Sequence, residues 1–335
     1  MSRKRLLFLL IGLAIGIVLI LLWLNFIDID DLLVRMRSID RNLVIWASLA
    51  YLSAYFIRSW RWNLLLKKQA SLSLYRTWLY SMGGNWVNYL IPIRLGEVVK
   101  AWFVKRNHGV PMLNVFPSIF IDKTFDTLGI FFVLIMIPLL GVRPSSGMTV
   151  LLSLLGLVFL VSLAILFLSV WRKDTVVQLL QALFSWLPNK AKEKIHRYIE
   201  IFIQGLNVFE HHWSRLAYAV LLTALGVGLD GLYFWLVFRA FGIDYPFVKV
   251  LFGYTLINLS YALPQPPAQL GSNEWMMIII FSIGFALTRQ DASAIMAFAH
   301  LLTAILIGVI GLIAIGLSGS QILRAIFHGE KIYEQ

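Results

Sequence analysis

Long apolar runs separated by charged connections dominate the pattern of hydrophobic and polar positions along the chain. No Asp, Glu, Lys or Arg occurs from Leu6 to Ile27, from Pro144 to Trp171, from Val250 to Asn273 or from Ala292 to Leu323. Apolar runs above about 18 residues are typical of membrane spans. We therefore predict an all-α integral membrane protein with six full transmembrane helices, at about 6–26, 42–62, 117–140, 148–171, 214–240 and 292–317.

Two further apolar regions, 76–106 and 248–288, are interrupted near their middle by Pro and Gly. The first interruption runs from Ile91 to Gly96, and the second runs from Pro264 to Gly271. Because the arms on either side are short for a full crossing, we predict two helix-break-helix re-entrant hairpins. If one or both hairpins cross fully, the chain has eight apparent spans.

The placement of basic residues predicts the orientation of these segments. With the N-terminus in the cytoplasm, most of the 29 Lys and Arg residues lie on the cytoplasmic side, as the positive-inside rule requires. The seven exceptions are Arg35, Arg37, Arg41, Arg143, Arg239, Lys249 and Arg289. In this orientation both termini are cytoplasmic, the first hairpin enters from the cytoplasm and the second enters from outside.

The chain therefore reads as a single polytopic membrane domain, 1–335, that contains two inverted units. The first unit covers 42–140 with hairpin 76–106, and the second covers 214–317 with hairpin 248–288. Between them, 172–213 is predicted as a cytoplasmic amphipathic connection, which either lies in the membrane interface or caps the helix bundle.

Interrupted helices in inverted units point to a transporter whose substrate site lies between the repeats. A broken helix exposes backbone N–H and C=O groups, which hydrocarbon does not tolerate unless they line a cavity or bind something. The breaks also share local sequence, since Tyr89 precedes Pro92 by three residues and Tyr261 precedes Pro264 by three.

Composition narrows the class of protein further. Apolar residues make up 59% of the chain and charged residues 14%, against roughly 45–50% and 25% in soluble domains, which excludes a soluble enzyme. The net charge of +12 lies in the connections, so its expected partner is anionic lipid rather than nucleic acid. The absence of Cys excludes disulfides and thiolate metal sites, and no cofactor is predicted.

The first break carries a candidate anion site. Arg94, Glu97 and Lys100 recur at three-residue steps after the break and share one helix face. The new helix N-terminus, with the N–H groups of Leu95 and Gly96 expected to be free, adds positive potential suited to a phosphate. Asn88 is a neutral donor and acceptor beside the break. In the alternative interpretation, Arg94 and Glu97 form an internal ion pair that only holds the hairpin.

A second candidate cluster lies in the first turns of the third predicted span. Asp122 and Asp126 are four residues apart and therefore face the same side, where like charges repel without a cation between them. Lys123, Arg94 and Lys100 are the counter-ions we consider. In the alternative interpretation, the cluster is solvated at the cytoplasmic interface.

The third candidate group consists of acidic residues in the second half of the chain. Asp230 lies inside an apolar span without a basic neighbour one turn away, so we expect it to be protonated or paired with another helix. Such a residue either couples transport to protons or forms a static pair. Gly271 and Glu274 follow the second break and are predicted to contribute to the substrate site.

The segment Pro92-Ile93-Arg94-Leu95-Gly96-Glu97-Val98-Val99-Lys100 resembles the membrane-domain family named after lysylphosphatidylglycerol synthase, also called flippase-like domain proteins. The resemblance continues in Asp122, Lys123 and Asp126 and in a Pro264, Gly271, Glu274 element. Lys100 and Lys123 stand where the family usually has Arg, and Asp122 stands where Glu is common. The resemblance implies a multi-pass protein of the bacterial or archaeal cytoplasmic membrane, linked to movement of phospholipids, aminoacylated lipids or polyprenyl-linked lipids.

Our first hypothesis is a lipid flippase-like transporter that binds an anionic phospholipid or a polyprenyl phosphate at the broken helices. Two alternatives stay open: a non-catalytic membrane partner of a lipid-modifying enzyme, and an integral-membrane lipid-phosphate transferase. A stand-alone aminoacyl-lipid synthase is not expected, because the soluble transferase domain of the synthases is absent from the sequence.

Overall fold

The structure is a computed structural model of the 335-residue chain. It describes residues 3–91, 95–134, 213–261 and 265–319, together with isolated positions between 157 and 200. These described residues form helices and no strand. The all-helical part of the predicted fold is therefore confirmed.

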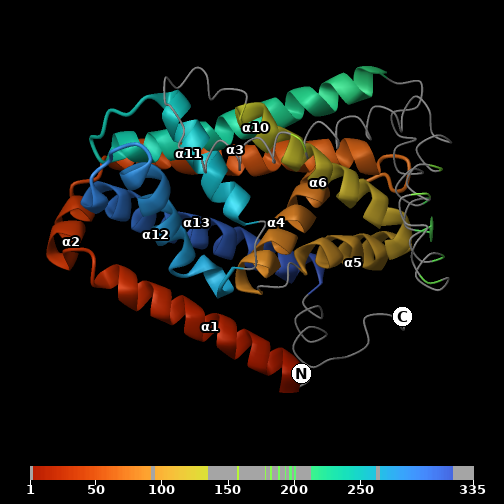
Figure 1. The fold of residues 1–335 in the computed structure, drawn as a ribbon. Coiled ribbons are helices and arrows are strands. Elements are labelled where there is room, and N and C mark those ends of the chain that lie inside the picture. Colours follow the sequence, from red (N-terminus) through yellow and green to blue (C-terminus); the bar gives the residue numbers. More distant parts are fainter. Residues whose placement is uncertain are drawn as a thin grey trace. The chain divides into compact units, whose positions relative to one another are not determined.

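The helices follow one another along the chain as Figure 1 shows. They are α1 (Arg3–Leu24), α2 (Ile29–Arg37), α3 (Arg41–Leu66), α4 (Leu74–Leu90), α5 (Gly96–His108), α6 (Met112–Leu134), α10 (Trp213–Ala240), α11 (Phe247–Ser260), α12 (Ser272–Met277) and α13 (Arg289–Ser318). A 3₁₀ turn at Pro267–Gln269 precedes α12, and a π-helical stretch at Ile278–Ile283 continues it.

Four of the six predicted spans coincide with long described helices: α1, α3, α10 and α13. By length and composition, Ser214–Ala240 and Arg289–Ser318 are apolar enough to cross a membrane, and a third span results if Leu10–Leu24 and Ile29–Arg37, which meet at 90°, count together. Helix α6 begins at Met112, five residues before the predicted 117–140 span. The predicted span 148–171, most of the connection 172–213 and residues 135–140 lie outside the described residues.

Both predicted interruptions separate helices. Helix α4 ends at Leu90 and α5 begins at Gly96, while α11 ends at Ser260 and α12 begins at Ser272. The second break contains three residues with positive φ, because Ala268, Gln269 and Gly271 have φ values of 54°, 57° and 76°. Residues other than Gly adopt this left-handed region only where surrounding contacts hold them there.

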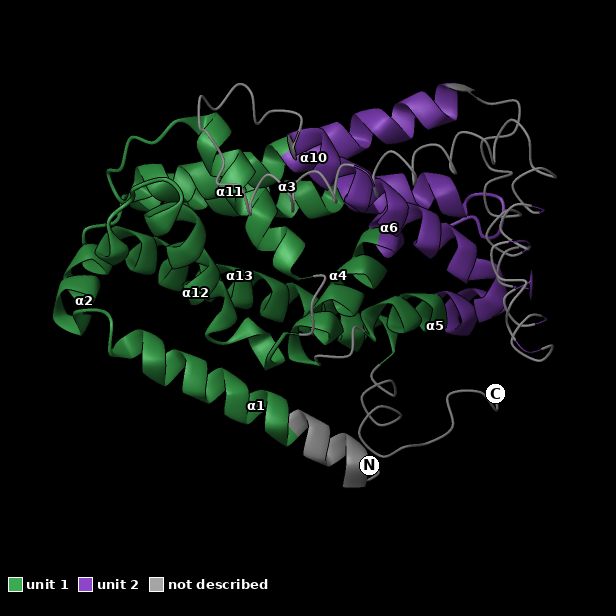
Figure 2. Cartoon of the chain, viewed as in Figure 1, with its two compact units in different colours: residues 1–56, 78–103, 228–335 green, residues 57–77, 104–227 purple. Residues whose placement is uncertain are grey.

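The chain divides into two compact units that alternate along the sequence (Figure 2). Unit 1 comprises Met1–Phe56, Trp78–Phe103 and Gly228–Gln335, and unit 2 comprises Ile57–Thr77 and Val104–Val227. Helices α3 and α10 therefore each contribute one half to unit 1 and the other half to unit 2. Unit 1 contains both helix breaks. The first break lies in the segment Trp78–Phe103, and the described residues of the second break, 265–271, lie in the segment Gly228–Gln335.

The core of unit 1 is aromatic. Phe234 and Phe238 of α10 pack on Phe281 of the π-helical stretch, with ring centroids 5.9 and 5.2 Å apart. Tyr233 contacts Tyr51 of α3 at 5.1 Å, and its hydroxyl donates to the Ala299 carbonyl of α13 at 3.1 Å. These contacts fix α3, α10 and α13 around the segment that follows the second break.

Helix α1 packs along the second break. Gly12 and Gly16 are four residues apart on α1, and Cβ atoms added there would lie 3.3 Å from Pro267 and 3.1 Å from Pro266. This spacing of small residues lets two backbones approach closely in membrane helices. The Trp275 indole of α12 also donates to the Leu19 carbonyl at 3.0 Å. The predicted first span is therefore a packing partner of the break.

The described part of unit 2 is built from the second half of α3, from α6 and from the first half of α10. Leu65, Ile121, Phe125 and Ala219 form its apolar cluster. The Trp62 indole donates to the Ser118 hydroxyl at 3.1 Å and joins α3 to α6. This packing brings the charged residues of α3 and α6 into contact.

Candidate functional site

Asn88 of α4 caps the helix that follows the first break. Its side-chain oxygen accepts a hydrogen bond from the Gly96 N–H at 2.6 Å, and its amide donates weakly to Glu97 at 3.4 Å. A helix N-terminus has free N–H groups that such a side chain satisfies. The expectation that the Gly96 N–H is free is therefore wrong, because Asn88 occupies it.

Glycine is required where α4 and α5 meet. A Cβ added to Gly96 would lie 2.0 Å from the Gly84 carbonyl oxygen, and one added to Gly84 would lie 2.8 Å from Cγ of Lys100. The two backbones therefore touch at these glycines. The contact also creates the space through which the Lys100 side chain runs.

Lys100 and Glu97 form an ion pair inside the first hairpin. The Lys100 ammonium lies 3.3 Å from a Glu97 oxygen, one helical turn away. Lys100 is only 4% exposed, while the Glu97 side chain is 21% exposed. Burial of a charge is costly without a partner, and Glu97 provides that partner for Lys100 in the interior. Arg94, the third residue of the predicted anion site, lies outside the described residues.

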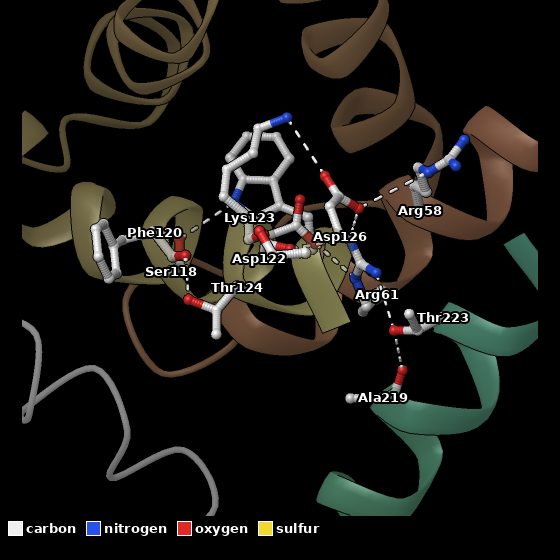
Figure 3. Close-up of polar contacts among 12 residues, drawn as sticks. Arg58, Arg61, Ser118, Phe120, Asp122, Lys123, Thr124, Asp126, Ala219 and Thr223 are labelled. Carbon is white, nitrogen blue, oxygen red and sulfur yellow. Dashed lines mark hydrogen bonds and ion pairs between the residues drawn. The ribbon is translucent and has the colours of Figure 1, made fainter. Parts of the chain in front are cut away.

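Unit 2 holds an ionic network centred on Arg61 of α3 (Figure 3). Its guanidinium contacts Asp122 at 2.7 Å and Asp126 at 2.5 Å, and it also donates to the Asp122 carbonyl at 3.1 Å. A further N–H donates to the Thr223 hydroxyl of α10 at 2.9 Å. Arg61 is 1% exposed, so this residue joins three helices through buried hydrogen bonds.

Two more cations approach Asp126. Lys123 lies 3.4 Å and Arg58 lies 3.8 Å from its oxygens. The cluster thus contains three basic and two acidic side chains and carries an excess positive charge. Asp122 and Asp126 can lie close together because the Arg61 guanidinium contacts both carboxylates. Lys123, which was predicted as a counter-ion from the sequence, also pairs with Asp126.

The third group forms a buried acid–base pair in unit 1. Glu274 is 3% exposed, and its oxygen lies 2.6 Å from Nδ1 of His300 on α13. The other ring nitrogen lies 2.8 Å from the Ala268 carbonyl in the break. Gly271 contacts α1, where an added Cβ would lie 2.4 Å from Leu19. Gly271 and Glu274 therefore connect the break to two different helices.

Asp230 lies in the half of α10 that belongs to unit 1 and is buried. It interacts electrostatically with the phenols of Tyr233 and Tyr254. Tyr254 in turn interacts with Tyr261 at the second break. Tyrosine hydroxyls of unit 1 are therefore part of the environment of Asp230.

The structure thus brings the predicted site residues together in three separate groups. Asn88, Gly96, Glu97 and Lys100 meet at the first break, Asp122, Lys123 and Asp126 meet in unit 2, and Gly271 and Glu274 lie at the second break. Among the residues that the structure describes, no group of three His, Asp or Glu side chains is arranged to hold a metal ion.

Sequence reasoning missed three residues of these groups: Arg58, Arg61 and His300. Arg61 and Arg58 lie inside the predicted span 42–62, and charged side chains in a span are candidates for function by default. His300 lies in the middle of the predicted span 292–317, where a lone polar ring is equally unusual. The arginines in one span and the histidine in another were visible in the sequence. The residues that they contact lie far away along the chain, so the pairs could not be predicted.

Comparison with known proteins agrees with a membrane fold. The family model described as the lysylphosphatidylglycerol synthase TM region matches residues 9–311. A UPF0104 membrane protein of Methanocaldococcus jannaschii is 24% identical over 314 residues, which cover 90% of this chain and 92% of that protein. A UPF0104 membrane protein of Methanothermobacter thermautotrophicus is 22% identical over 284 residues, which cover 81% and 82%. No solved structure matches the chain.

Proposed function

Because the chain belongs to the family of the lysylphosphatidylglycerol synthase transmembrane region, we propose that it transports a lipid with an anionic headgroup across the cytoplasmic membrane. The lipid is an anionic phospholipid or a polyprenyl-phosphate-linked lipid. The observation that carries this proposal is the buried Lys100 beside the break between α4 and α5.

A buried lysine beside a helix break is suited to bind a phosphate. Hydrocarbon disfavours a buried charge, so the presence of Lys100 in the interior of an apolar protein favours a polar ligand beside it. Glu97 is the partner of Lys100 when no headgroup is bound. A phosphate that reaches Lys100 replaces Glu97 as its partner, while the acyl or prenyl chains stay in the lipid. From the sequence, Arg94 is predicted to provide a further donor, because a guanidinium can give two hydrogen bonds to one phosphate.

The positive excess around Asp126 supports an anionic substrate as well. Arg61 is fully engaged with Asp122, Asp126 and Thr223 and serves as the fixed centre of that cluster. Lys123 and Arg58 are partly exposed, with side chains 42% and 26% accessible. They attract anionic headgroups at the protein surface.

The arrangement predicted from the sequence favours transport over catalysis. The predicted re-entrant hairpins enter from opposite sides in inverted units, and such units alternate the exposure of a central site. The orientation with both termini in the cytoplasm places most basic residues on the cytoplasmic side. Membrane lipids are the expected partners, and no enzyme activity is assigned.

The test is leaflet-resolved movement of fluorescent lipids in proteoliposomes. The panel contains anionic phospholipids, a zwitterionic phospholipid and a polyprenyl phosphate. We expect wild-type protein to move at least one anionic lipid, and we expect Arg94→Ala and Glu97→Ala to abolish this movement. Arg106→Ala changes an exposed basic residue of the same helix and serves as the matched control.

Folding of each variant is checked by size-exclusion chromatography in detergent before reconstitution. Normal movement by correctly folded Arg94→Ala and Glu97→Ala proteins would contradict the site. Movement of no lipid by the wild type would contradict transport and favour the role of a membrane partner for a lipid-modifying enzyme.

A further inference from the structure

The pair of Glu274 and His300 joins the second helix break to the middle of α13. Glu274 lies in the first turn of α12, and His300 lies 26 residues later on α13. Both residues are buried, with 3% and 8% of their surfaces exposed. An acid and a base held at 2.6 Å in the interior form a distinct chemical site, which the anion site at the first break does not use.

The geometry determines how many protons this site contains. The Ala268 carbonyl only accepts hydrogen bonds, so Nε2 of His300 carries a proton that it donates there. The contact between Nδ1 and the Glu274 oxygen needs one more proton, on either atom. Without that proton, two lone pairs would face each other at 2.6 Å. The observed arrangement is therefore the proton-loaded state.

A second observation concerns the oxygen of the carboxyl that does not face His300. The other oxygen of Glu274 and the side-chain oxygen of Asn273 are buried, and neither has a hydrogen-bond donor among the residues that the structure describes. A full carboxylate charge with one unsatisfied oxygen is costly in the interior. Release of the proton therefore requires water or another donor to reach this oxygen, and hence an opening of the site.

We propose that Glu274 and His300 form a proton-binding site whose occupancy holds the second helix break in its closed conformation. Loading adds one proton from water to the line between Nδ1 and the carboxyl oxygen, and release returns it to water. No electrons move. The ligand of the site is thus the proton itself.

The break is suited to respond to this proton. Ala268 and Gln269 adopt left-handed backbone conformations, which persist only where other contacts hold them. The Nε2–H of His300 is one such contact. When the pair loses its proton, Glu274 and His300 repel, the ring turns and Ala268 loses its donor. Because Gly12 and Gly16 of α1 pack against the same break, the change reaches α1.

The groups that face the pair come from several elements. Tyr89 of α4 contacts the His300 ring edge-on, with centroids 6.1 Å apart. Tyr261, which follows α11, interacts with Glu274 and with the Asn273 amide. Both are phenols that carry no charge near neutral pH. On α10, Asp230 interacts with Tyr254, which interacts with Tyr261.

Infrared difference spectroscopy across pH tests proton binding directly. Wild-type protein in lipid nanodiscs is titrated from about pH 5 to about pH 8, the range in which histidine titrates. We expect one proton per chain to be released from the pair as pH rises, with changes in carboxyl and imidazole bands that disappear in Glu274→Gln and in His300→Gln. Asp244→Asn removes an exposed acid and serves as the control whose spectrum keeps these changes.

Hydrogen exchange of the amides in 265–271 tests the coupling to the break. In the wild type, we expect exchange to rise with pH by on the order of tenfold beyond its intrinsic pH dependence, the effect of losing about one buried hydrogen bond. Glu274→Gln keeps a donor to Nδ1 without a titrating proton, so its exchange should stay low at every pH. His300→Ala lacks the donor to Ala268, so its exchange should be high at every pH.

Two results would overturn the proposal: no titration assigned to Glu274 or His300, or exchange in the break that follows only the intrinsic pH dependence. Coupling of the proton to lipid movement rests on the proposed transport function, but neither measurement requires transport. If no lipid moves while the pair titrates and opens the break, transport fails and the proton site stands. If lipids move while the pair does not titrate, the proton site alone fails.

Discussion

The two helix breaks of unit 1 place Tyr, Pro, Gly and Glu in the same order but give the glutamate different partners. At the first break, Glu97 pairs with Lys100, three residues along the same helix, at 3.3 Å. At the second break, Glu274 pairs with His300 from another helix at 2.6 Å. Lysine is a permanent cation near neutral pH, whereas histidine gains and loses its proton there. The first break is thus suited to bind an anion, and the second is suited to bind a proton.

The partners also differ in how they are held. Lys100 follows Glu97 by one helical turn, so formation of α5 is sufficient to bring them together. His300 reaches Glu274 only when α12 and α13 pack. Disruption of tertiary packing should therefore separate the second pair before the first. The four changes below test the ion cluster of unit 2 and the contacts that hold the first break, from the largest expected effect on stability to the smallest.

Arg61→Met should reduce the stability of the protein more than the other three changes. It measures how much an ion cluster with a purely structural role contributes to the free energy of unfolding. Removal of the guanidinium leaves Asp122 and Asp126 facing each other in the interior. Breaking such a buried pair costs about 3–5 kcal/mol. Thermal unfolding in detergent measures the loss, and Arg37→Met, at an exposed position on α2, is the control. An unchanged melting temperature for Arg61→Met would show that this cluster does not stabilise unit 2.

Gly96→Ala should be the most damaging change at the first break itself. The added methyl would lie 2.0 Å from the Gly84 carbonyl oxygen, so α4 and α5 must separate. Overpacking of this kind costs roughly 1–3 kcal/mol. Gly308→Ala is the matched control, because a Cβ at that position of α13 meets no atom within 4 Å. Equal stability of both variants would contradict the close backbone contact.

Lys100→Met tests how much the ion pair at the first break contributes to stability, apart from the packing of the two helices. The single variant leaves Glu97 without its cation, whereas Lys100→Met combined with Glu97→Gln removes both charges. Neighbouring residues show coupling energies of about 0.5–3 kcal/mol, so the double variant should be more stable than the sum of the single changes predicts. Additive losses in unfolding free energy would mean that the ion pair does not stabilise the hairpin.

Asn88→Ala should have the smallest effect. It removes the acceptor of the Gly96 N–H at the start of α5, and loss of a helix cap costs about 1 kcal/mol. Asn88→Ser and Asn88→Asp offer other acceptors and should recover part of the stability. If all three variants unfold at the same temperature as the wild type, Asn88 does not cap α5.

Sequence reasoning succeeded where the determining pattern is local. The apolar runs predicted helices, Pro and Gly predicted both interruptions, and the motif at residues 92–100 indicated the family, which the match over 9–311 confirms. Helical spacing placed Glu97 and Lys100 on one helix face, but the ion pair considered from the sequence joined Glu97 to Arg94, whereas the structure pairs Glu97 with Lys100. The number of full crossings, the re-entrance of the hairpins and the inverted units remain predictions.

The remaining features depend on tertiary packing, which one sequence does not reveal. Arg61 meets Asp122 across 61 residues, and His300 meets Glu274 across 26. The expectation that the Gly96 N–H is free was wrong, because the Asn88 side chain of the preceding helix accepts its hydrogen bond. The contact of Gly12 and Gly16 with Pro267 and Pro266 also requires α1 to pack on a segment some 250 residues away.

Leaflet-resolved lipid movement by the double variant of Lys100→Met and Glu97→Gln tests the role of the first break most directly. This variant keeps the shape of the hairpin while removing its buried charges, so loss of activity cannot be attributed to a charge left without a partner. We expect a folded protein that no longer moves anionic lipid, beside a wild type that does. Movement at the wild-type rate by the folded double variant would contradict headgroup binding at Lys100.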